Sequence, residues 1–245
     1  MGQLQSEAIV LRSWPFQEAD LLVSLFTREQ GRIKGVARHA MRSRRRFGGA
    51  LEPMTQVRAS YTERPRQDLV RLDAFEIAWS PLKDPIDLGR ATALAFIAEV
   101  LESALPEHAQ DDDIFRLTVA VSQQMQVDRI WLPLTYFALW ITRLMGWMPE
   151  LSVCAVSGKP LHGEKLYYSP TRDGVTSAEH RASGSVSLEA ESVALAARIF
   201  HQPVTAFAEE DWPRNRASDL RRFAITTLER HLEERLTSAR MLAKL

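Results

Sequence analysis

The chain has 245 residues with 31 basic and 31 acidic side chains, and 45% of its residues are hydrophobic. This composition excludes a disordered chain, a collagen and a disulfide scaffold, and the length suits one large domain or two smaller ones. The single cysteine, Cys154, has no partner for an internal disulfide, which favours a cytoplasmic location.

Signals for membrane insertion and export are weak. The longest uncharged, apolar-rich run covers residues 130–142, which is shorter than the ~20 residues of a membrane-spanning helix. Residues 1–7 are polar and lack the basic-then-apolar layout of a secretory signal. We therefore expect a soluble protein that stays where it is made.

The first 80 residues have the pattern of short β-strands. Runs rich in β-branched, aliphatic or aromatic residues, separated by polar or turn residues, cover positions 8–14, 21–27, 32–39, 55–62 and 69–75. Five such strands predict a small closed or partly closed barrel of the OB-fold type over residues 1–80, with a small sandwich as the alternative.

A run without acidic residues lies between Gln30 and Leu51. Its basic residues are Arg32, Lys34, Arg38, Arg42, Arg44, Arg45 and Arg46. Strand alternation puts the first three on one face of the third predicted strand. Because guanidinium groups bind phosphates through paired hydrogen bonds, the patch indicates a polyanion such as DNA. The alternative is a solvated loop that only keeps the protein soluble.

Three aromatic residues of the predicted barrel have two interpretations. Trp14, Phe16 and Tyr61 are candidate platforms on which exposed bases stack. Packing in the core of a small barrel is the favoured role for each of them.

After Pro81 the apolar spacing becomes helical, which predicts a helical domain over residues 81–245 and an α+β fold class. An Asp-Pro pair at 84–85 predicts the start of one helix, which ends before Pro106. Three aspartates at 111–113 predict the negatively charged start of a second helix, through residue 125, in preference to a metal site.

A third predicted helix, 134–147, follows Pro133 and is apolar on nearly every side. This pattern is typical of a helix at the centre of a bundle, and a groove for a partner is the alternative. Residues 150–186 are rich in glycine and proline and predict an irregular insertion.

Two further helices are predicted near 188–200 and after a Trp-Pro pair at 212–213. The last one carries His231, which we interpret as a core or boundary histidine. Its arginines either contact an anion or are neutralised by nearby acids, and the sequence leaves this open for Arg214, Arg216, Arg221 and Arg222.

Three segments carry a family resemblance. Residues 7–27 read EAIVLRSWPFQEADLLVSLFT, residues 31–38 read GRIKGVAR, and residues 46–53 read RFGGALEP. In this order and spacing they resemble the bacterial RecO family of DNA repair proteins, over the whole length of the chain. The resemblance implies an N-terminal OB-fold, a helical region and a zinc-finger-like element in mid-chain.

The zinc-finger-like element departs from the family pattern. Many relatives carry two Cys-x-x-Cys pairs there, whereas this chain has Cys154-x-x-Ser157 and Ser177-x-x-His180. Serine is a poor zinc ligand, and adding His162 gives three ligands at unconvincing spacing. We therefore predict no bound zinc and no other cofactor.

The resemblance implies a recombination mediator that binds single- and double-stranded DNA and anneals complementary strands. It also implies that the protein engages the C-terminal tail of single-strand binding protein and pairs with RecR to help load RecA, in the cytoplasm at the nucleoid. That tail is acidic and ends in an aromatic residue, so we expect Arg129, Trp140 and Arg143 to receive it.

Two alternatives are a protein–protein adaptor and a small nuclease. A nuclease gathers carboxylates around metal ions, whereas Glu52, Asp68 and Asp73 are scattered and no hydrolase or phosphate-loop motif occurs. A nucleophilic Cys154 would need a partnered base such as His180. We therefore expect a binding protein and no enzyme.

Overall fold

The computed structural model describes residues 2–63 and 67–245, without the side chain of Arg44. The chain divides into two compact units, residues 1–128 with 240–245 and residues 129–239. The first unit contains the strands of residues 1–80 together with helices α2 (Leu88–Ala104) and α3 (Asp112–Gln124). The predicted boundary between residues 80 and 81 thus falls inside this unit.

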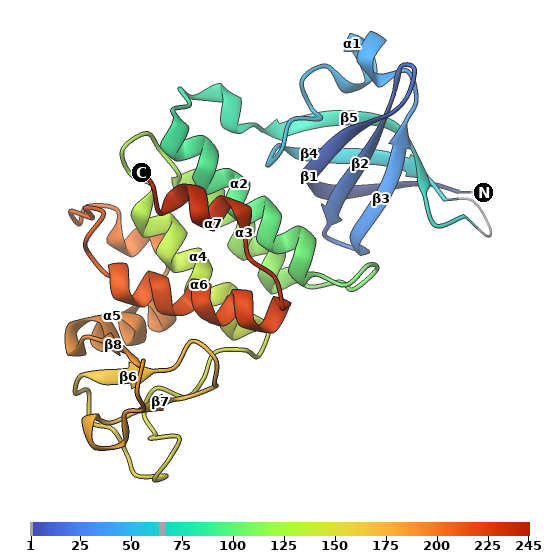
Figure 1. Ribbon diagram of the computed structural model, residues 1–245. Helices are drawn as coiled ribbons and strands as arrows, with labels where there is room; N and C mark the ends of the chain where they lie inside the picture. Colours follow the sequence, from blue (N-terminus) through green and yellow to red (C-terminus); the bar gives the residue numbers. More distant parts are fainter. Residues whose placement is uncertain (1, 64–66) are drawn as a thin grey trace. The chain divides into compact units, whose positions relative to one another are not determined.

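Five strands close into a barrel in the order β1-β2-β3-β5-β4 (Figure 1). Neighbouring strands are antiparallel except for β3 and β5, which pair in parallel. The arrangement confirms the α+β class with an N-terminal OB-like barrel and excludes the sandwich. The strands are β1 (Gln3–Gln17), β2 (Asp20–Thr27), β3 (Gly31–Ala37), β4 (Gln56–Thr62) and β5 (Val70–Trp79).

Two strands are longer than their sequence patterns predict. β1 begins at Gln3, where it already pairs with Thr62 of β4, and β5 continues to Trp79. The β1 extension is mostly polar, whereas the β5 extension adds Ile77, Ala78 and Trp79, which are exposed or half-buried and show no alternation in polarity. Backbone pairing with β4 holds both extensions whatever their side chains.

Strict alternation holds in β3, where Ile33 and Gly35 face the barrel interior and Arg32 and Lys34 face outward. Gly31 starts this strand at a φ of 69°, and a Cβ there would lie 2.1 Å from the carbonyl oxygen of Ala109. Only glycine allows the barrel to approach the loop between α2 and α3 this closely.

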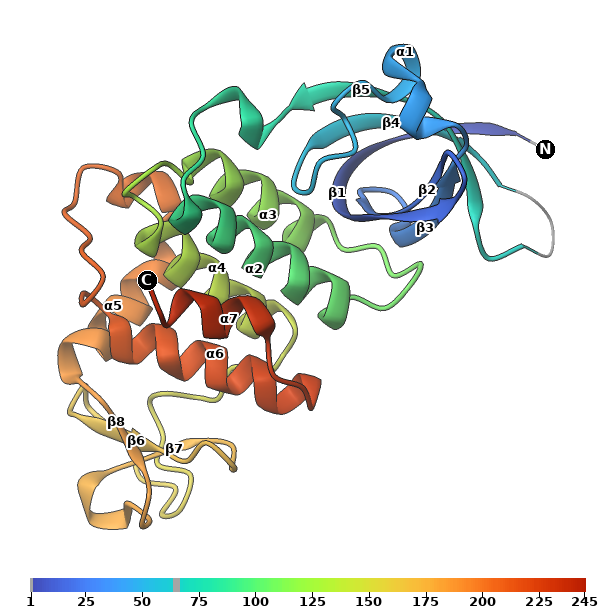
Figure 2. The same cartoon turned by 45° about the horizontal axis from the view of Figure 1, so that its top comes forward.

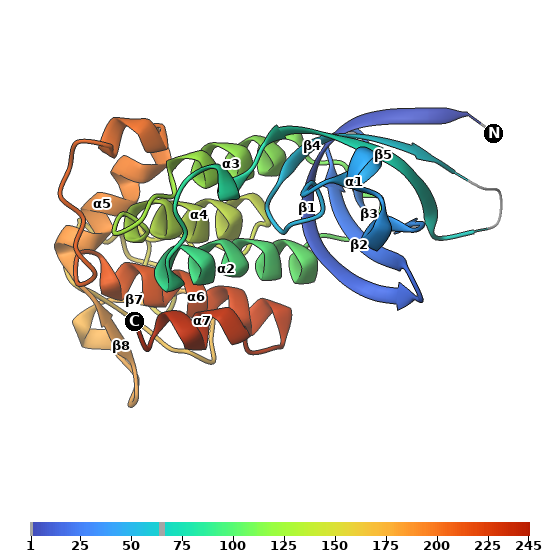
Figure 3. The ribbon, with the colours of Figure 1, turned by 90° about the horizontal axis from the view of Figure 1, so that it is seen from above.

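The two long helices of the first unit, α2 and α3, are drawn in green in Figure 3. α3 begins as predicted, because the Asp111 carboxylate accepts a hydrogen bond from the N–H of Ile114 at 2.9 Å. The predicted start of α2 at the Asp-Pro pair is wrong: Asp87 caps the helix, at 2.7 Å from the N–H of Arg90.

The second unit contains α4 (Trp131–Leu144), α5 (Ala190–His201) and α6 (Ser218–Leu232). α4 is buried along most of its length, which confirms the central helix of the prediction. α6 begins at Ser218, several residues later than the Trp-Pro pair predicts. The short helix α7 (Thr237–Leu242) follows it.

The predicted irregular insertion holds a small sheet in the order β7-β6-β8. These strands are β6 (Leu166–Tyr168), β7 (Val175–Thr176) and β8 (Val186–Leu188). Within the described ranges of the chain, no helix combines the length and the hydropathy that crossing a bilayer requires.

Candidate nucleic-acid interface

The basic stretch leaves the barrel at the end of β3 and forms two short helices, η1 (Ala40–Arg42) and α1 (Arg44–Phe47). Phe47 and Ala50 insert into the barrel core, and the Phe47 ring packs edge-on against Phe75 with centroids 5.5 Å apart. Figure 2 shows α1 across one end of the barrel. The core therefore fixes the position of the basic loop at the barrel rim.

Four basic side chains of this loop form what we call the arginine cluster, which consists of Arg38, Arg42, Arg45 and Arg46. The first three are exposed and Arg46 is half-buried. None of the four pairs with a carboxylate of the residues that the structure describes. Arg44 lies between them in the chain, and its side chain is outside the described residues. The cluster thus presents uncompensated positive charge to solvent.

Arg46 also holds the loop together. Its Nη2 donates to the carbonyl oxygen of Arg38 at 2.6 Å and its Nε to the hydroxyl of Ser43 at 3.2 Å. Its guanidinium lies over the Phe47 ring, 5.2 Å from the centroid. Arg38, Arg42 and Arg45 are therefore the cluster members most free to meet an anion.

The two cations on β3 differ from the cluster, because carboxylates of α2 and of the segment after it neutralise them. Arg32 is paired with Glu102 at 3.3 Å and Glu107 at 3.4 Å, and its side chain is only 12% exposed. Lys34 lies 2.9 Å from Glu107. In the sequence both belong to the same basic run as the cluster, and their acidic partners lie too far along the chain for a local pattern to reveal them.

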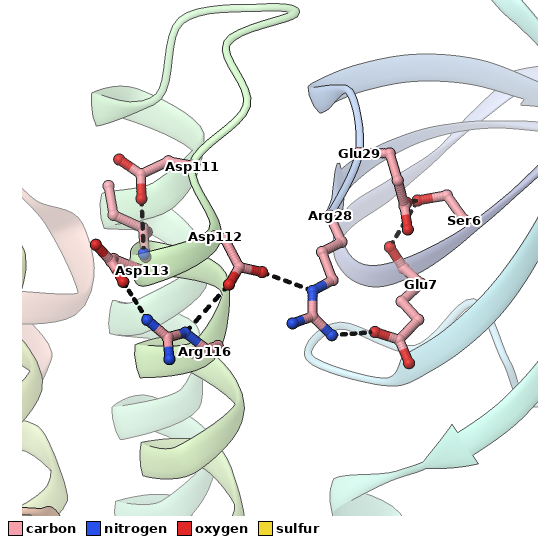
Figure 4. Close-up of polar contacts among 9 residues, drawn as sticks. Ser6, Glu7, Arg28, Glu29, Asp111, Asp112, Asp113 and Arg116 are labelled. Carbon is pink, nitrogen blue, oxygen red and sulfur yellow. Dashed lines mark hydrogen bonds and ion pairs between the residues drawn. The ribbon is translucent and has the colours of Figure 1, made fainter.

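Arg28 forms a second link between the barrel and α3 (Figure 4). It donates to Glu7 at 2.7 Å and to Asp112 at 2.6 Å. The hydrogen bond with Arg28 lowers the pKa of the Asp112 carboxyl and raises the pKa of the guanidinium. The three aspartates at 111–113 indicate a helix start in the sequence, but no local pattern links Asp112 to Arg28, which lies 84 positions away.

The three predicted aromatic platforms have different environments. Tyr61 is 1% exposed in the barrel core, and burial raises its pKa to about 12. Trp14 is half-buried with Arg12 above its ring, 5.3 Å from the centroid. Phe16 is 45% exposed on the outside of the barrel. Core packing is thus confirmed for Tyr61 and wrong for Phe16.

In the second unit, the structure brings together two of the three predicted partner-binding residues. The Arg143 guanidinium lies 5.5 Å from the centroid of the Trp140 ring and 4.5 Å from that of Phe200. The Trp140 indole donates to the carbonyl oxygen of Ile199 at 3.1 Å. Arg129 precedes the other end of α4 and donates to the Ala208 carbonyl.

Arg143 also lines a hollow of about 540 Å³. Apolar side chains of Leu151, Leu161 and Val193 form part of its wall, and Phe200 forms another part. The hollow therefore combines the Arg143 guanidinium and the Glu150 carboxylate with a partly apolar wall, and the sequence identified only Arg143 among its lining residues.

The arginines near the start of α6 are largely engaged. Arg221 is 7% exposed and donates to the Arg214 carbonyl at 2.6 Å, and burial lowers its pKa to about 10. Arg216 pairs with Glu210, and Arg214 lies 5.8 Å from the Trp131 ring centroid. Neutralisation, one of the two alternatives, thus applies to Arg216.

The zinc-finger-like element is held by hydrogen bonds around Cys154. Bonds from the Ser157 hydroxyl and from the N–H groups of Ser157 and Ser177 lower the pKa of the thiol to about 6. The Ser177 hydroxyl lies 3.2 Å from Nδ1 of His180. Nowhere in the described chain do three or more His, Cys, Asp or Glu side chains gather as a metal site requires, so these residues do not fit zinc.

Comparison with known families gives two matches that together span nearly the whole chain. Residues 1–80 match the model described as recombination protein O N terminal, and residues 86–240 match recombination protein O C terminal. The two matches meet close to the predicted boundary at residue 80.

Two relatives that are similar over nearly their whole length are both named DNA repair protein RecO. The DNA repair protein RecO of Koribacter versatilis (strain Ellin345) is 49% identical over 241 residues, which cover 98% of each chain. That of Anaeromyxobacter sp. (strain K) is 32% identical over 251 residues, covering 99% of this chain and 96% of the relative.

Proposed function

The chain belongs to the RecO family of DNA repair proteins, and from this premise we propose that it is a recombination mediator that binds single- and double-stranded DNA through the arginine cluster. The observation that carries the proposal is the absence of any carboxylate partner for Arg38, Arg42, Arg45 and Arg46 within the described residues. We assign Arg44 to the same DNA-binding surface because it lies between Arg42 and Arg45 in the chain.

Phosphate binding by this cluster follows from electrostatics. Arginine contacts displace the cations condensed on DNA, so the affinity falls as salt rises, with a slope of about −0.7 per contact on single strands. Arg32 and Lys34 contribute less, because Glu102 and Glu107 already compensate their charge.

We infer strand annealing from the same cluster. Two complementary strands repel each other through their phosphates, and a surface that neutralises both lowers this repulsion. No bond is made or broken, so annealing needs neither a nucleotide nor a metal. The protein acts in the cytoplasm at the nucleoid and pairs with RecR to help load RecA.

Annealing of complementary strands tests the proposal. The variant Arg42→Ala/Arg45→Ala is expected to anneal naked and protein-coated strands more slowly, while the wild type leaves the strands intact in the presence of magnesium. If the variant anneals strands as fast as the wild type, the DNA contact lies outside Arg42 and Arg45. Degradation of the strands would favour the nuclease, and absence of any binding would favour the adaptor.

A second binding function concerns the tail of single-strand binding protein. We infer that the hollow beside Arg143 receives it, because the tail is acidic with a terminal aromatic residue and the hollow combines that guanidinium with an apolar wall. One carboxylate, Glu150, is also part of the lining. Arg143→Ala is expected to weaken binding of a labelled tail peptide and to leave DNA binding unchanged. Arg129→Ala is the control, because that guanidinium is occupied by the Ala208 carbonyl.

A further inference from the structure

We propose that the outer face of the barrel around Phe16 receives an unpaired base of single-stranded DNA, so that this face distinguishes single strands from duplex. The inference rests on the DNA binding proposed above and adds a base-binding subsite to it. Its basis is an exposed aromatic ring beside a hollow that borders the arginine cluster.

The face is built by pairing across four strands. Trp14 pairs with Leu22, Leu22 with Val36, and Val36 with Arg71 of β5. Directly paired residues share one face of a sheet, and Trp14, Leu22 and Val36 are all half-buried on the outside of the barrel. The row is therefore an outward apolar platform that ends at Arg71, whose guanidinium pairs with Asp73 at 2.7 Å.

This platform is open at only one end. Further along the same strands, the buried Ser24 hydroxyl donates to Glu102 of α2 at 2.5 Å, and Lys34 pairs with Glu107. Helix α2 and the segment that follows it thus cover that end of the face. Phe16 lies at the opposite end, where its ring is 45% exposed.

A hollow of about 370 Å³ lies beside Phe16. This is within the range of roughly 300–1,000 Å³ that is typical of ligand pockets. Val36, Leu69 and Val70 line it with apolar surface. The amides of Gln17 and Gln67 also line it and can donate to or accept from the edge of a base.

The charged side chains around the hollow balance one another, so the hollow has no net attraction for a phosphate. Two carboxylates, Asp20 and Asp68, and two guanidinium groups, Arg38 and Arg71, are part of the lining. The Asp20 carboxylate accepts from the N–H of His39 at 2.7 Å, whereas Asp68 is exposed. Arg38 lines the hollow and belongs to the arginine cluster, so a strand can place its phosphates on the cluster and one base against Phe16.

Duplex DNA cannot use this subsite without unpairing, because its bases are already stacked and paired. Base–aromatic stacking has enough strength to change affinity by about tenfold per base. The platform therefore predicts that strands with bases bind more tightly than strands without bases, and that this difference is separate from the salt-dependent phosphate contacts.

The test compares three fluorescently labelled probes of equal length: an oligo(dT) strand, an abasic strand and a duplex. The wild type is expected to bind oligo(dT) about tenfold more tightly than the abasic strand. Phe16→Ala is expected to remove this difference and to leave abasic and duplex binding unchanged. Phe16→Trp should retain it, and its added indole emission should be quenched by oligo(dT).

Leu82→Ala is the matched control, because Leu82 is an apolar side chain of the same unit that is 57% exposed. The inference is overturned if Phe16→Ala still binds oligo(dT) more tightly than the abasic strand, or if the substitution lowers the affinity for all three probes equally. A wild type that binds the three probes without base preference also overturns it but leaves the proposed function intact. A wild type that binds none of them overturns both.

Discussion

Lys34 on β3 lies 2.9 Å from the carboxylate of Glu107, which follows α2 in the chain. The same carboxylate is 3.4 Å from Arg32, so a single acid compensates two cations that the sequence presents as part of one basic run. This pairing separates the basic residues into an engaged pair on the barrel wall and an uncompensated arginine cluster at its rim.

Removing the charge of Glu107 should release Lys34. We expect Glu107→Gln to bind single-stranded DNA more tightly at low salt and to steepen the logarithmic salt dependence by up to about 0.7, the value of one phosphate contact. Glu76→Gln is the matched control, because it removes an equal charge from the exposed pair with Arg58. Equal effects of the two variants would show that only the net charge matters.

The same carboxylate makes stability depend on pH. The hydrogen bond from Lys34, with smaller contributions from the charges of Lys34 and Arg32, lowers the pKa of Glu107 in the folded state. Its stabilisation is therefore present above the ordinary carboxyl pKa and is lost as the pH falls through the lowered value.

Urea unfolding of the wild type and of Glu107→Gln measures this contribution. At neutral pH the variant is expected to be less stable by less than about 1 kcal/mol, because the pair is partly exposed. The two proteins should converge in acid. A difference that grows as the pH falls would contradict the assignment.

Arg90 is expected to matter for the first unit. Its side chain is 1% exposed and donates to the carbonyl oxygens of Met125 at 2.9 Å, Asp84 at 3.1 Å and Pro85 at 2.6 Å. Arg90→Met keeps the bulk of the side chain but leaves these acceptors without a donor, which should cost at least about 3 kcal/mol.

Thermal or urea unfolding checks the expectation for Arg90. Arg116→Met is the control, because Arg116 is 64% exposed and its ion pairs with α3 should contribute less than about 1 kcal/mol. Equal destabilisation by the two variants would contradict a structural role for the buried guanidinium.

The cysteine-poor element offers a gain-of-function test. Ser157 hydrogen-bonds to the Cys154 thiol and Ser177 contacts His180, so Ser157→Cys/Ser177→Cys would provide three thiolates and one imidazole. We expect the double variant to bind one zinc ion per chain and to melt at a higher temperature with zinc than without it. The wild type should show neither effect. A double variant that does not bind zinc would show that the side chains at positions 154, 157, 177 and 180 do not converge on one point.

Local patterns predicted the parts of the fold that local physics determines. The alternation of β3 and the Asp111 cap of α3 could be read from the sequence, because each depends on residues a few positions apart. The start of α2 could not, since Asp84 and Asp87 are both plausible caps. The carbonyls of Asp84 and Pro85 accept from Arg90, which keeps that segment extended and leaves Asp87 to cap the helix.

The candidate site shows the same division. The sequence identified the basic run and its aromatic neighbours, but it could not separate Arg32 from Arg42. That distinction depends on Glu102, which is 70 positions from Arg32 in the chain. Exposure was only partly visible in the sequence: Tyr61 shares one strand face with Val57 and Ala59, whereas Phe16 lies between Pro15 and Gln17 without such a pattern. In the closed barrel the Tyr61 ring lies in the core and the Phe16 ring lies outside.

The salt dependence of single-strand binding tests the central claim most directly. For Arg42→Ala/Arg45→Ala we predict weaker binding and a logarithmic salt slope that is shallower by about 1.4, the value of two lost phosphate contacts. The control Arg58→Ala/Arg116→Ala removes the same charge from arginines that are already paired with carboxylates, and its slope should change much less. Equal slope changes in the two variants, or an unchanged slope in the first, would contradict phosphate binding by the arginine cluster.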